Sequence, residues 1–382
     1  MDSRFIDTSP SLSYNDDKSE DEYAFVKALR MSGGDGANSY SANSLLQRKV
    51  LSMAKAVLVK NTEEMMMTLD FPKYIKVAEL GCSSGQNTFL AMSEIINTIN
   101  VLCQQLNQNP PLIDCCLNDL PENDFNTTFK FVPFFNKELL ITNKTSCFVY
   151  GAPGSFYSRL FSRSSIHFIH SSYALHWLSK VPEKLENDKG SVYITSSSPQ
   201  SAYKTYLNQL QRDFTMFLKL RSEEIVSSGR MVLTFIGKNT LNDDPLYRDC
   251  CHFWTLLSIR DLVNEGIVSE SKLDAFNMPF YDPNEQELKE VIRNEGSFEI
   301  NDLETHGFDL GHSTCDEYKK DQYEAGHNES NCIRAVSEPM LVAHFGEDII
   351  DILFDKYAHH VIQHANCLAK TTVTLVVSLT KK

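Results

Sequence analysis

The chain has 382 residues, 42% of them hydrophobic and 23% charged, a composition typical of globular proteins that excludes a fibrous or largely disordered chain. Its formal net charge is −14 at pH 7, and because so acidic a chain repels phosphate backbones, we expect no nucleic-acid partner. No apolar run reaches the roughly 18 residues that a membrane span requires, so we also expect no membrane association.

The cysteines and the N-terminus favour a reducing compartment. Ten cysteines are scattered along the chain without a CxxC motif, and the polar, acidic first residues lack the basic and apolar regions of a signal peptide. We therefore expect reduced thiols and a cytoplasmic location.

Residues 1–24 carry many acids and few apolar anchors, which predicts a disordered N-terminal extension. From about residue 75, short apolar segments alternate with longer segments of helical periodicity. Strands are expected at 75–80, 114–117, 146–150, 166–170, 190–194, 231–237 and 371–379. Helices are expected at 89–106, 202–225, 251–263 and 285–293, the second of them stopped by the Ser-Ser-Gly sequence at 227–229.

This alternation predicts an α/β fold, with a mostly parallel, Rossmann-like sheet and helices on both faces. The region from about 238 to 345 reads as more helical and irregular. Such a region is expected to cover the carboxyl edge of the sheet, which is where open α/β sheets bind their ligands.

Two segments at predicted strand ends indicate a nucleoside ligand. The segment 79–87 combines small residues with an acid, but it is neither GxGxxG nor a P-loop. It favours an adenosyl group or a nucleotide, against the alternative of an ordinary strand-to-helix turn. Asp119 ends the next strand, where a carboxylate can accept both ribose hydroxyls; the alternative is an N-cap or a turn residue.

Two further segments follow later strands. In 151–157, small residues could form the floor of a ligand site and aromatic residues its wall, although a plain loop would have the same composition. In 170–178, Tyr173, His176 and Trp177 suit a flat aromatic or carboxylate ligand. The alternative is that Trp177 belongs to the core and His176 is merely hydrogen-bonded there.

Taken together, these segments resemble a known family, the plant carboxyl and N-methyltransferases that use S-adenosylmethionine (SAM) and act on salicylate, benzoate, jasmonate or caffeine precursors. The resemblance extends over residues 28–382 and is strongest to the members that methylate benzoate and salicylate. It rests on the stretches 31–47, 79–87, 117–125, 151–160, 170–182, 272–279, 338–340 and 344–346.

The resemblance implies a SAM-dependent methyltransferase sheet with a mostly α-helical cap, and SAM as co-substrate. It divides the chain into the N-terminal extension (1–24), a core with the donor site (25–240), a cap that forms the acceptor pocket (241–345), and a C-terminal helix and strand that complete the core (346–382). The partner implied is a small aromatic carboxylic acid, whose methyl ester is the product. Relatives are commonly homodimers, so a homodimer is expected.

The family's site residues map onto this chain position by position. The donor site would use Tyr40, Cys82, Asn87, Asp119, Leu120, Ser155 and Phe156. The acceptor would meet Gln47, Tyr173, His176, Trp177 and Trp254. Gln47 and Trp177 would position the carboxylate, and no residue would act as a general base. A structural Mg²⁺ would be held by Asp188, Asp274, Phe276 and Asn277.

His176 leaves the substrate open. Salicylate-selective members of the family have methionine at this position, and histidine occurs in jasmonate- and xanthine-directed relatives. The expected activity is carboxyl methylation of benzoate, salicylate or both. The alternatives are jasmonate or another plant acid as substrate, or an acid-binding protein of the same fold without activity.

Overall fold

In the computed structural model, residues 27–143, 147–182, 191–194, 198–238, 250–309, 322–364 and 371–382 are described. The strands are β1 (Tyr74–Leu80), β2 (Leu112–Asp119), β3 (Cys147–Pro153), β4 (Ile166–Ser172), β5 (Ile225–Gly237), β6 (Phe298–Asp309) and β7 (Thr371–Lys381). The helices are α2 (Tyr40–Asn43), α3 (Leu45–Thr68), α4 (Asn87–Gln105), α5 (Phe125–Phe129), α6 (Val132–Asn143), α7 (Gln200–Glu224), α9 (Cys250–Asn264), α10 (Glu270–Ala275), α11 (Glu285–Glu295), α12 (Gln322–Phe345), the 3₁₀ helix η3 (Glu347–Ile349) and α13 (Ile350–His364).

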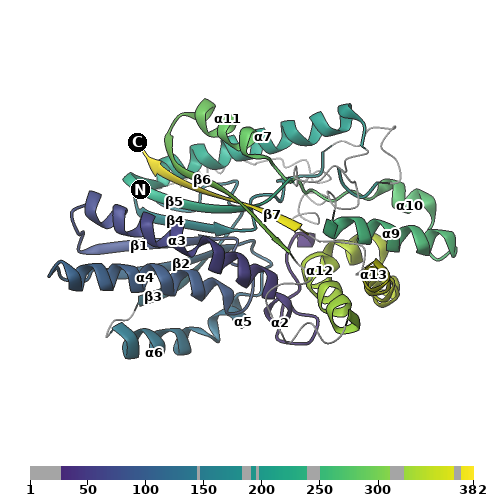
Figure 1. Ribbon diagram of the computed structural model, residues 1–382, viewed down its shortest axis with the longest axis horizontal. Coiled ribbons are helices and arrows are strands. Elements are labelled where there is room, and N and C mark those ends of the chain that lie inside the picture. Colours follow the sequence, from purple (N-terminus) through teal and green to yellow (C-terminus); the bar gives the residue numbers. More distant parts are fainter. Residues whose placement is uncertain are drawn as a thin grey trace, which may run out of the picture.

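All seven strands form one sheet in the order β3-β2-β1-β4-β5-β7-β6. The first five strands in this order are parallel, and β7 runs antiparallel to both β5 and β6. Helices α3, α4 and α6 cover one face, and α7 and α11 cover the other (Figure 1). The predicted mostly parallel α/β sheet with helices on both faces is therefore confirmed.

Apolar side chains at helical spacing fix α4 on its face of the sheet. Met92, Ile95, Ile96 and Ile99 are fully buried in the cluster that includes Val77 of β1. Full burial of each such side chain contributes about 1.5–3 kcal/mol. The opposite face is closed by a second cluster, to which α7 and α11 contribute.

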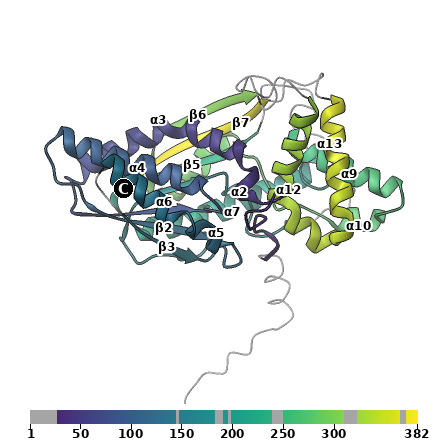
Figure 2. The ribbon, with the colours of Figure 1, turned by 90° about the horizontal axis from the view of Figure 1, so that it is seen from below.

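A group of helices stands beside the sheet. Helices α9, α10, α12 and α13 share their own apolar cluster, which includes Leu262, Leu341 and Leu353, and they lie at one end of the sheet (Figure 2). Among the described helices, none is long and apolar enough to cross a membrane.

Helices α3 and α6 fall outside the helix ranges expected from the sequence, and three further elements differ from the sequence prediction. Helix α7 ends at Glu224 and β5 begins at the next residue, so the sequence 227–229 lies inside the strand. It does not stop the helix as predicted; it forms an irregularity in β5, where Ser228 has a φ of 64°. Residues 191–194 form bends rather than a strand, tied to the cap by the hydrogen bond from Met278 N to Val192 O (2.7 Å).

The third difference is β6, which falls in the region expected to be helical and irregular. It pairs with β7 along its whole length, and α11 packs against it. Its sequence has few apolar residues because it is an edge strand, which explains why hydrophobic patterning missed it. The predicted N-terminal extension, 1–24, lies outside the described residues.

Candidate active site

A cavity opens between the carboxyl edge of the sheet and the helices beside it. Its empty space is about 1150 Å³, counting the part open to solvent. Its lining consists of Leu29, Met31, Tyr40, Leu46, Gln47, Gly81, Ser83, Asp119, Leu120, Ser155, Phe156, Tyr157, Ser172, Tyr173, Ala174, His176, Trp177, Leu178, Ser179, Ile236, Phe280, Cys332, Ile333 and Val336.

Gly81 forms the floor directly after β1. Its φ is +76°, and a Cβ atom there would stand 2.4 Å from the Cβ atom of Ala174. Only glycine combines this left-handed backbone with so close a neighbour. The chain can therefore turn sharply at the strand end and leave the backbone open to a ligand.

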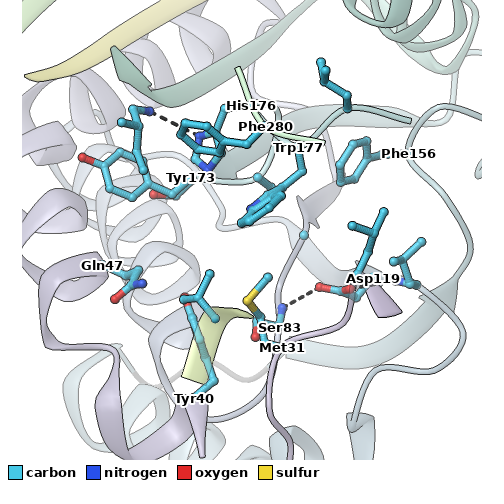
Figure 3. Close-up of a pocket in the computed structure, with 18 of the residues that line it drawn as sticks. Met31, Tyr40, Gln47, Ser83, Asp119, Phe156, Tyr173, His176, Trp177 and Phe280 are labelled. Atoms are coloured by element: carbon cyan, nitrogen blue, oxygen red, sulfur yellow. Dashed lines mark hydrogen bonds between the residues drawn. The ribbon is translucent and has the colours of Figure 1, made fainter. Parts of the chain in front are cut away.

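Asp119 lies at the end of β2 and carries the main charge of this side of the cavity (Figure 3). Its carboxylate accepts hydrogen bonds from Ser83 N and from Leu120 N, both at 2.7 Å. Burial raises the pKa of Asp119 to about 6, and the two backbone N–H groups oppose that shift. The hydroxyl of Ser83 is buried without a hydrogen-bond partner, which leaves it available to a polar ligand.

The loop after β3 supplies an aromatic wall. Phe156 and Tyr157 line the cavity together with Ser155, and the two rings stand edge to face with centroids 4.7 Å apart. An aromatic ring on the same cavity as the Asp119 carboxylate is compatible with the nucleoside ligand expected from the sequence. The ends of β1, β2 and β3 thus meet on one side of the cavity, and this side is called the donor half below because the donor site is predicted there.

The other half is aromatic. The rings of Tyr173, His176, Trp177 and Phe280 lie next to one another on it (Figure 3), and the Trp177 and Phe280 ring centroids are 5.5 Å apart. Ile236 N donates a hydrogen bond to His176 Nδ1 (3.3 Å), so a neutral His176 ring carries its proton on Nε2.

Helices α2, α3 and α12 close the remaining side. Tyr40 and Gln47 come from α2 and α3, and Cys332 comes from α12. The Sγ atom of Cys332 lies 4.0 Å from Gln47 Oε1. Burial raises the pKa of the Cys332 thiol to about 12, with Glu329 adding to the shift, so Cys332 is a neutral donor at the acceptor end.

Comparison with known proteins now decides the family. The profile of the family described as SAM dependent carboxyl methyltransferase matches residues 26–382. The chain belongs to this family.

Among its relatives, a salicylate/benzoate carboxyl methyltransferase of Arabidopsis thaliana is 83% identical over the whole of both chains. A jasmonate O-methyltransferase of the same plant is 42% identical, covering 93% of this chain and 99% of its own. The solved structure of a loganic acid methyltransferase with S-adenosylhomocysteine (SAH) has a TM-score of 0.79 and 34% identity, covering 92% of this chain and 98% of its own.

For a carboxyl methyltransferase, the cavity has the two halves that the reaction requires. Nine of the predicted site residues line it: Tyr40, Gln47, Asp119, Leu120, Ser155, Phe156, Tyr173, His176 and Trp177. Asp119, the unpartnered Ser83 hydroxyl and the open backbone at Gly81 fit a SAM molecule. The assignment of individual contacts to SAM or to the acid stays a prediction.

Two predicted donor residues do not line the cavity. Cys82 is buried beneath it, 6% exposed, with its thiol directed to Ser83 O. Asn87 opens α4 and donates to Ser44 O and Oγ at 3.0 and 2.8 Å. In this structure Asn87 therefore joins α4 to the start of α3. The side chain of Trp254, in α9, lies outside the described residues.

The described residues include only some of the predicted metal ligands. Asp188 lies outside the described residues, Asp274 belongs to the short helix α10, and Phe276 caps that helix. Among the residues that the structure describes, no three His, Cys, Asp or Glu side chains are placed to hold a metal ion. The Mg²⁺ site remains a prediction.

Several residues that line the cavity were not among those predicted from the sequence. Met31, Phe280, Cys332, Ile333 and Val336 come from the N-terminal segment, from the segment after α10 and from α12. Met31 belongs to a stretch that carries the family resemblance, which is a signal that could have included it. The α12 residues have no sequence pattern that marks them as site residues. Ile333, for example, belongs to the apolar cluster of the helices and also lines the cavity.

Proposed function

We propose that this protein transfers the methyl group of SAM to the carboxylate of benzoate, of salicylate or of both, giving the methyl ester. The observation that carries the proposal is the joined cavity, with a ribose-type carboxylate, Asp119, in one half and an aromatic cage in the other. The 83% identity to a salicylate/benzoate carboxyl methyltransferase supports this choice of acid.

The reaction needs no general base. A benzoic-type acid has a pKa of about 4, so it enters as the carboxylate at neutral pH. One carboxylate oxygen forms a bond to the methyl carbon while the carbon–sulfur bond breaks, and the electron pair stays on sulfur to give SAH. His176 is therefore a wall of the pocket rather than a proton acceptor.

The chain's own contribution is alignment. Nucleophile, methyl carbon and sulfur must be collinear, with reacting atoms about 3–3.5 Å apart. Gln47 and the Trp177 indole N–H are neutral donors that can hold one carboxylate oxygen without quenching the other. Among the described residues that line the cavity there is no lysine or arginine, so these donors position the anion without forming an ion pair.

The apolar walls exclude water from the reacting groups. Phe280 and Ile236 flank the aromatic half, and His176 is only 2% exposed. A dry pocket strengthens the attraction between the carboxylate and the positively charged sulfonium.

The substrate is tested by methyl transfer from labelled SAM to benzoate, salicylate, jasmonate, indole-3-acetate and xanthosine. We expect benzoate and salicylate to be esterified fastest, with mixed use of the two, because one hydroxyl changes binding by only about 1–3 kcal/mol in an apolar pocket. Preference for jasmonate, the substrate class of a 42% identical relative, would overturn the choice of acid. Binding of SAH without methylation of any acid would favour an acid-binding protein.

Three finer features are also proposed. A structural Mg²⁺ at Asp188, Asp274, Phe276 and Asn277 is supported by its oxygen donors, and metal analysis of the purified protein tests it. A homodimer is supported by exposed apolar side chains such as Phe134, Ile141 and Phe148, and light scattering tests it. A cytoplasmic location is supported by free cysteines at 82, 103, 115, 116, 147 and 332, and fractionation tests it.

A further inference from the structure

A fully buried ion pair lies behind the donor wall. Arg221 and Glu224, in the last turn of α7, both have side chains with 0% exposure, and Arg221 Nε is 2.7 Å from Glu224 Oε2. Neither residue lines the cavity. Burying two charges costs several kcal/mol of solvation free energy. The groups that the pair binds therefore indicate its role in the structure.

The guanidinium holds the backbone on both sides of Tyr157. Arg221 Nη1 donates to Phe156 O and Nη2 donates to Ser158 O, both at 2.8 Å. The second oxygen of Glu224 accepts from Leu160 N (2.8 Å) and Phe161 N (3.1 Å). The ion pair thus fixes the loop that supplies the aromatic wall of the donor half.

Tyr157 connects this loop to the acceptor half. Its hydroxyl donates a hydrogen bond to Trp177 O (2.7 Å), while its neighbour Phe156 forms the donor wall. Two other backbone contacts anchor the same segment: Leu178 N to Pro279 O and Tyr281 N to His176 O. Of these three contacts, only the hydrogen bond from Tyr157 comes from the loop after β3.

We propose that Arg221, held by Glu224, and the hydroxyl of Tyr157 are positioning groups that set the Phe156 wall and the Trp177 indole relative to each other. A planar guanidinium presents a rigid fork of donors, whereas the lysine ammonium is a compact charge with rotatable donors and does not reproduce that geometry. Because methyl transfer depends on alignment, an error of about 1 Å can lower the rate about a hundredfold. The kinetic test of this proposal rests on the proposed function, because it measures methyl transfer to the acid.

The test uses Arg221→Lys, Tyr157→Phe, their double variant, and Arg230→Lys as a matched control. Arg230 is also a buried arginine, 8% exposed, paired with Glu64 at 2.9 Å, but it does not line the cavity and, among the described residues, makes no hydrogen bond to the loop after β3. The melting temperature, the SAH dissociation constant, and kcat and KM for the acid at saturating SAM are measured for each protein.

We expect Tyr157→Phe to leave SAH affinity within about twofold and to lower kcat/KM for the acid about tenfold, the effect of one lost hydrogen bond. Arg221→Lys should weaken SAH binding and lower kcat tenfold or more. The kcat of the double variant should lie within about twofold of that of Arg221→Lys, because both changes break the same connection. Arg230→Lys should lower the melting temperature without changing either kinetic constant.

Equal kinetic effects of Arg221→Lys and Arg230→Lys, full additivity in the double variant, or unchanged kinetics in Tyr157→Phe would each overturn the proposal. A second readout needs no acid. The chain has two tryptophans, so in a Trp254→Phe background Trp177 is the only indole. Tyr157→Phe should then speed the fluorescence anisotropy decay of Trp177, and an unchanged decay would contradict the connection even if no tested acid is methylated.

Discussion

At the residue scale, the proposed reaction relies on two neutral donors from distant parts of the chain. Gln47 is in α3 and Trp177 follows β4, and both line the same cavity. A hydrogen bond to a charged group contributes about 1.5–3 kcal/mol. These two residues should therefore affect turnover far more than stability.

We predict that Gln47→Ala and Trp177→Ala each lower kcat/KM for the acid by ten- to a hundredfold or more, consistent with that energy. SAH affinity and the melting temperature should change little in Gln47→Ala. Trp177→Phe, which keeps an aromatic ring but removes the N–H, separates hydrogen bonding from packing. Near-normal kinetics in both alanine variants would refute the assignment.

We predict that Asp119 makes SAH binding depend on pH. Its pKa in the free protein is about 6, raised by burial, and ribose hydroxyls that donate to it favour the carboxylate form. Its pKa must then fall on binding, so affinity for SAH should rise with pH up to about 6 and level off above it.

Calorimetric titration with SAH between about pH 5 and pH 8 checks this prediction, since the ligand's own groups titrate outside that range. Asp119→Asn is the control. It should bind more weakly and show no step near this pH, although Glu79, whose pKa burial also raises, is still present. A step of equal size in Asp119→Asn would assign the effect to another group.

At the element scale, the turn from β1 into α4 has a steric requirement that can be tested. A Cβ atom on Gly81 would meet the Cβ atom of Ala174 at 2.4 Å, and the φ of Gly81 is +76°. Gly81→Ala should lower the free energy of unfolding by about 1–3 kcal/mol, from strain together with the clash, and should weaken SAH binding.

Ala174→Gly offers a matched rescue, because it removes the atom that the new methyl group would strike. The double variant should recover the part due to the clash but not the part due to the positive φ. Denaturant unfolding and SAH titration of all four proteins measure both parts. No recovery in the double variant would mean that backbone strain alone sets the cost.

At the scale of the whole molecule, the cavity is shared by the sheet and by α12 of the helical group beside it. A ligand there should stabilise the molecule as a unit. At SAH concentrations about 100 times Kd, the gain is about 2.7 kcal/mol. For 382 residues, an unfolding entropy of about 2.1 cal/mol/K per residue converts this gain to a rise of about 3 °C in Tm.

Scanning fluorimetry with and without SAH measures this shift. Asp119→Asn should lose most of it at the same SAH concentration, whereas Arg230→Lys should keep it from a lower starting Tm. A shift that is the same in Asp119→Asn would show that SAH binds without the carboxylate.

The sequence by itself determined the parallel sheet, the buried face of α4 and the strand-end residues that line one side of the cavity. The reason is that local pattern decides these features: strands end where small residues and Asp119 stand, and parallel strands bring those ends to one edge. It did not indicate β6, because that strand has few apolar residues and is stabilised by its hydrogen-bonded pairing with β7.

Only the tertiary structure decided which other residues reach the site. Cys332 and Gln47 are far apart in the sequence, yet their side chains come within 4.0 Å, and Asn87 turned inward to Ser44 instead of lining the cavity. The buried pair behind Tyr157 likewise depends on α7 crossing the loop after β3. Such long-range contacts follow from how helices pack on the sheet, which no local spacing specifies.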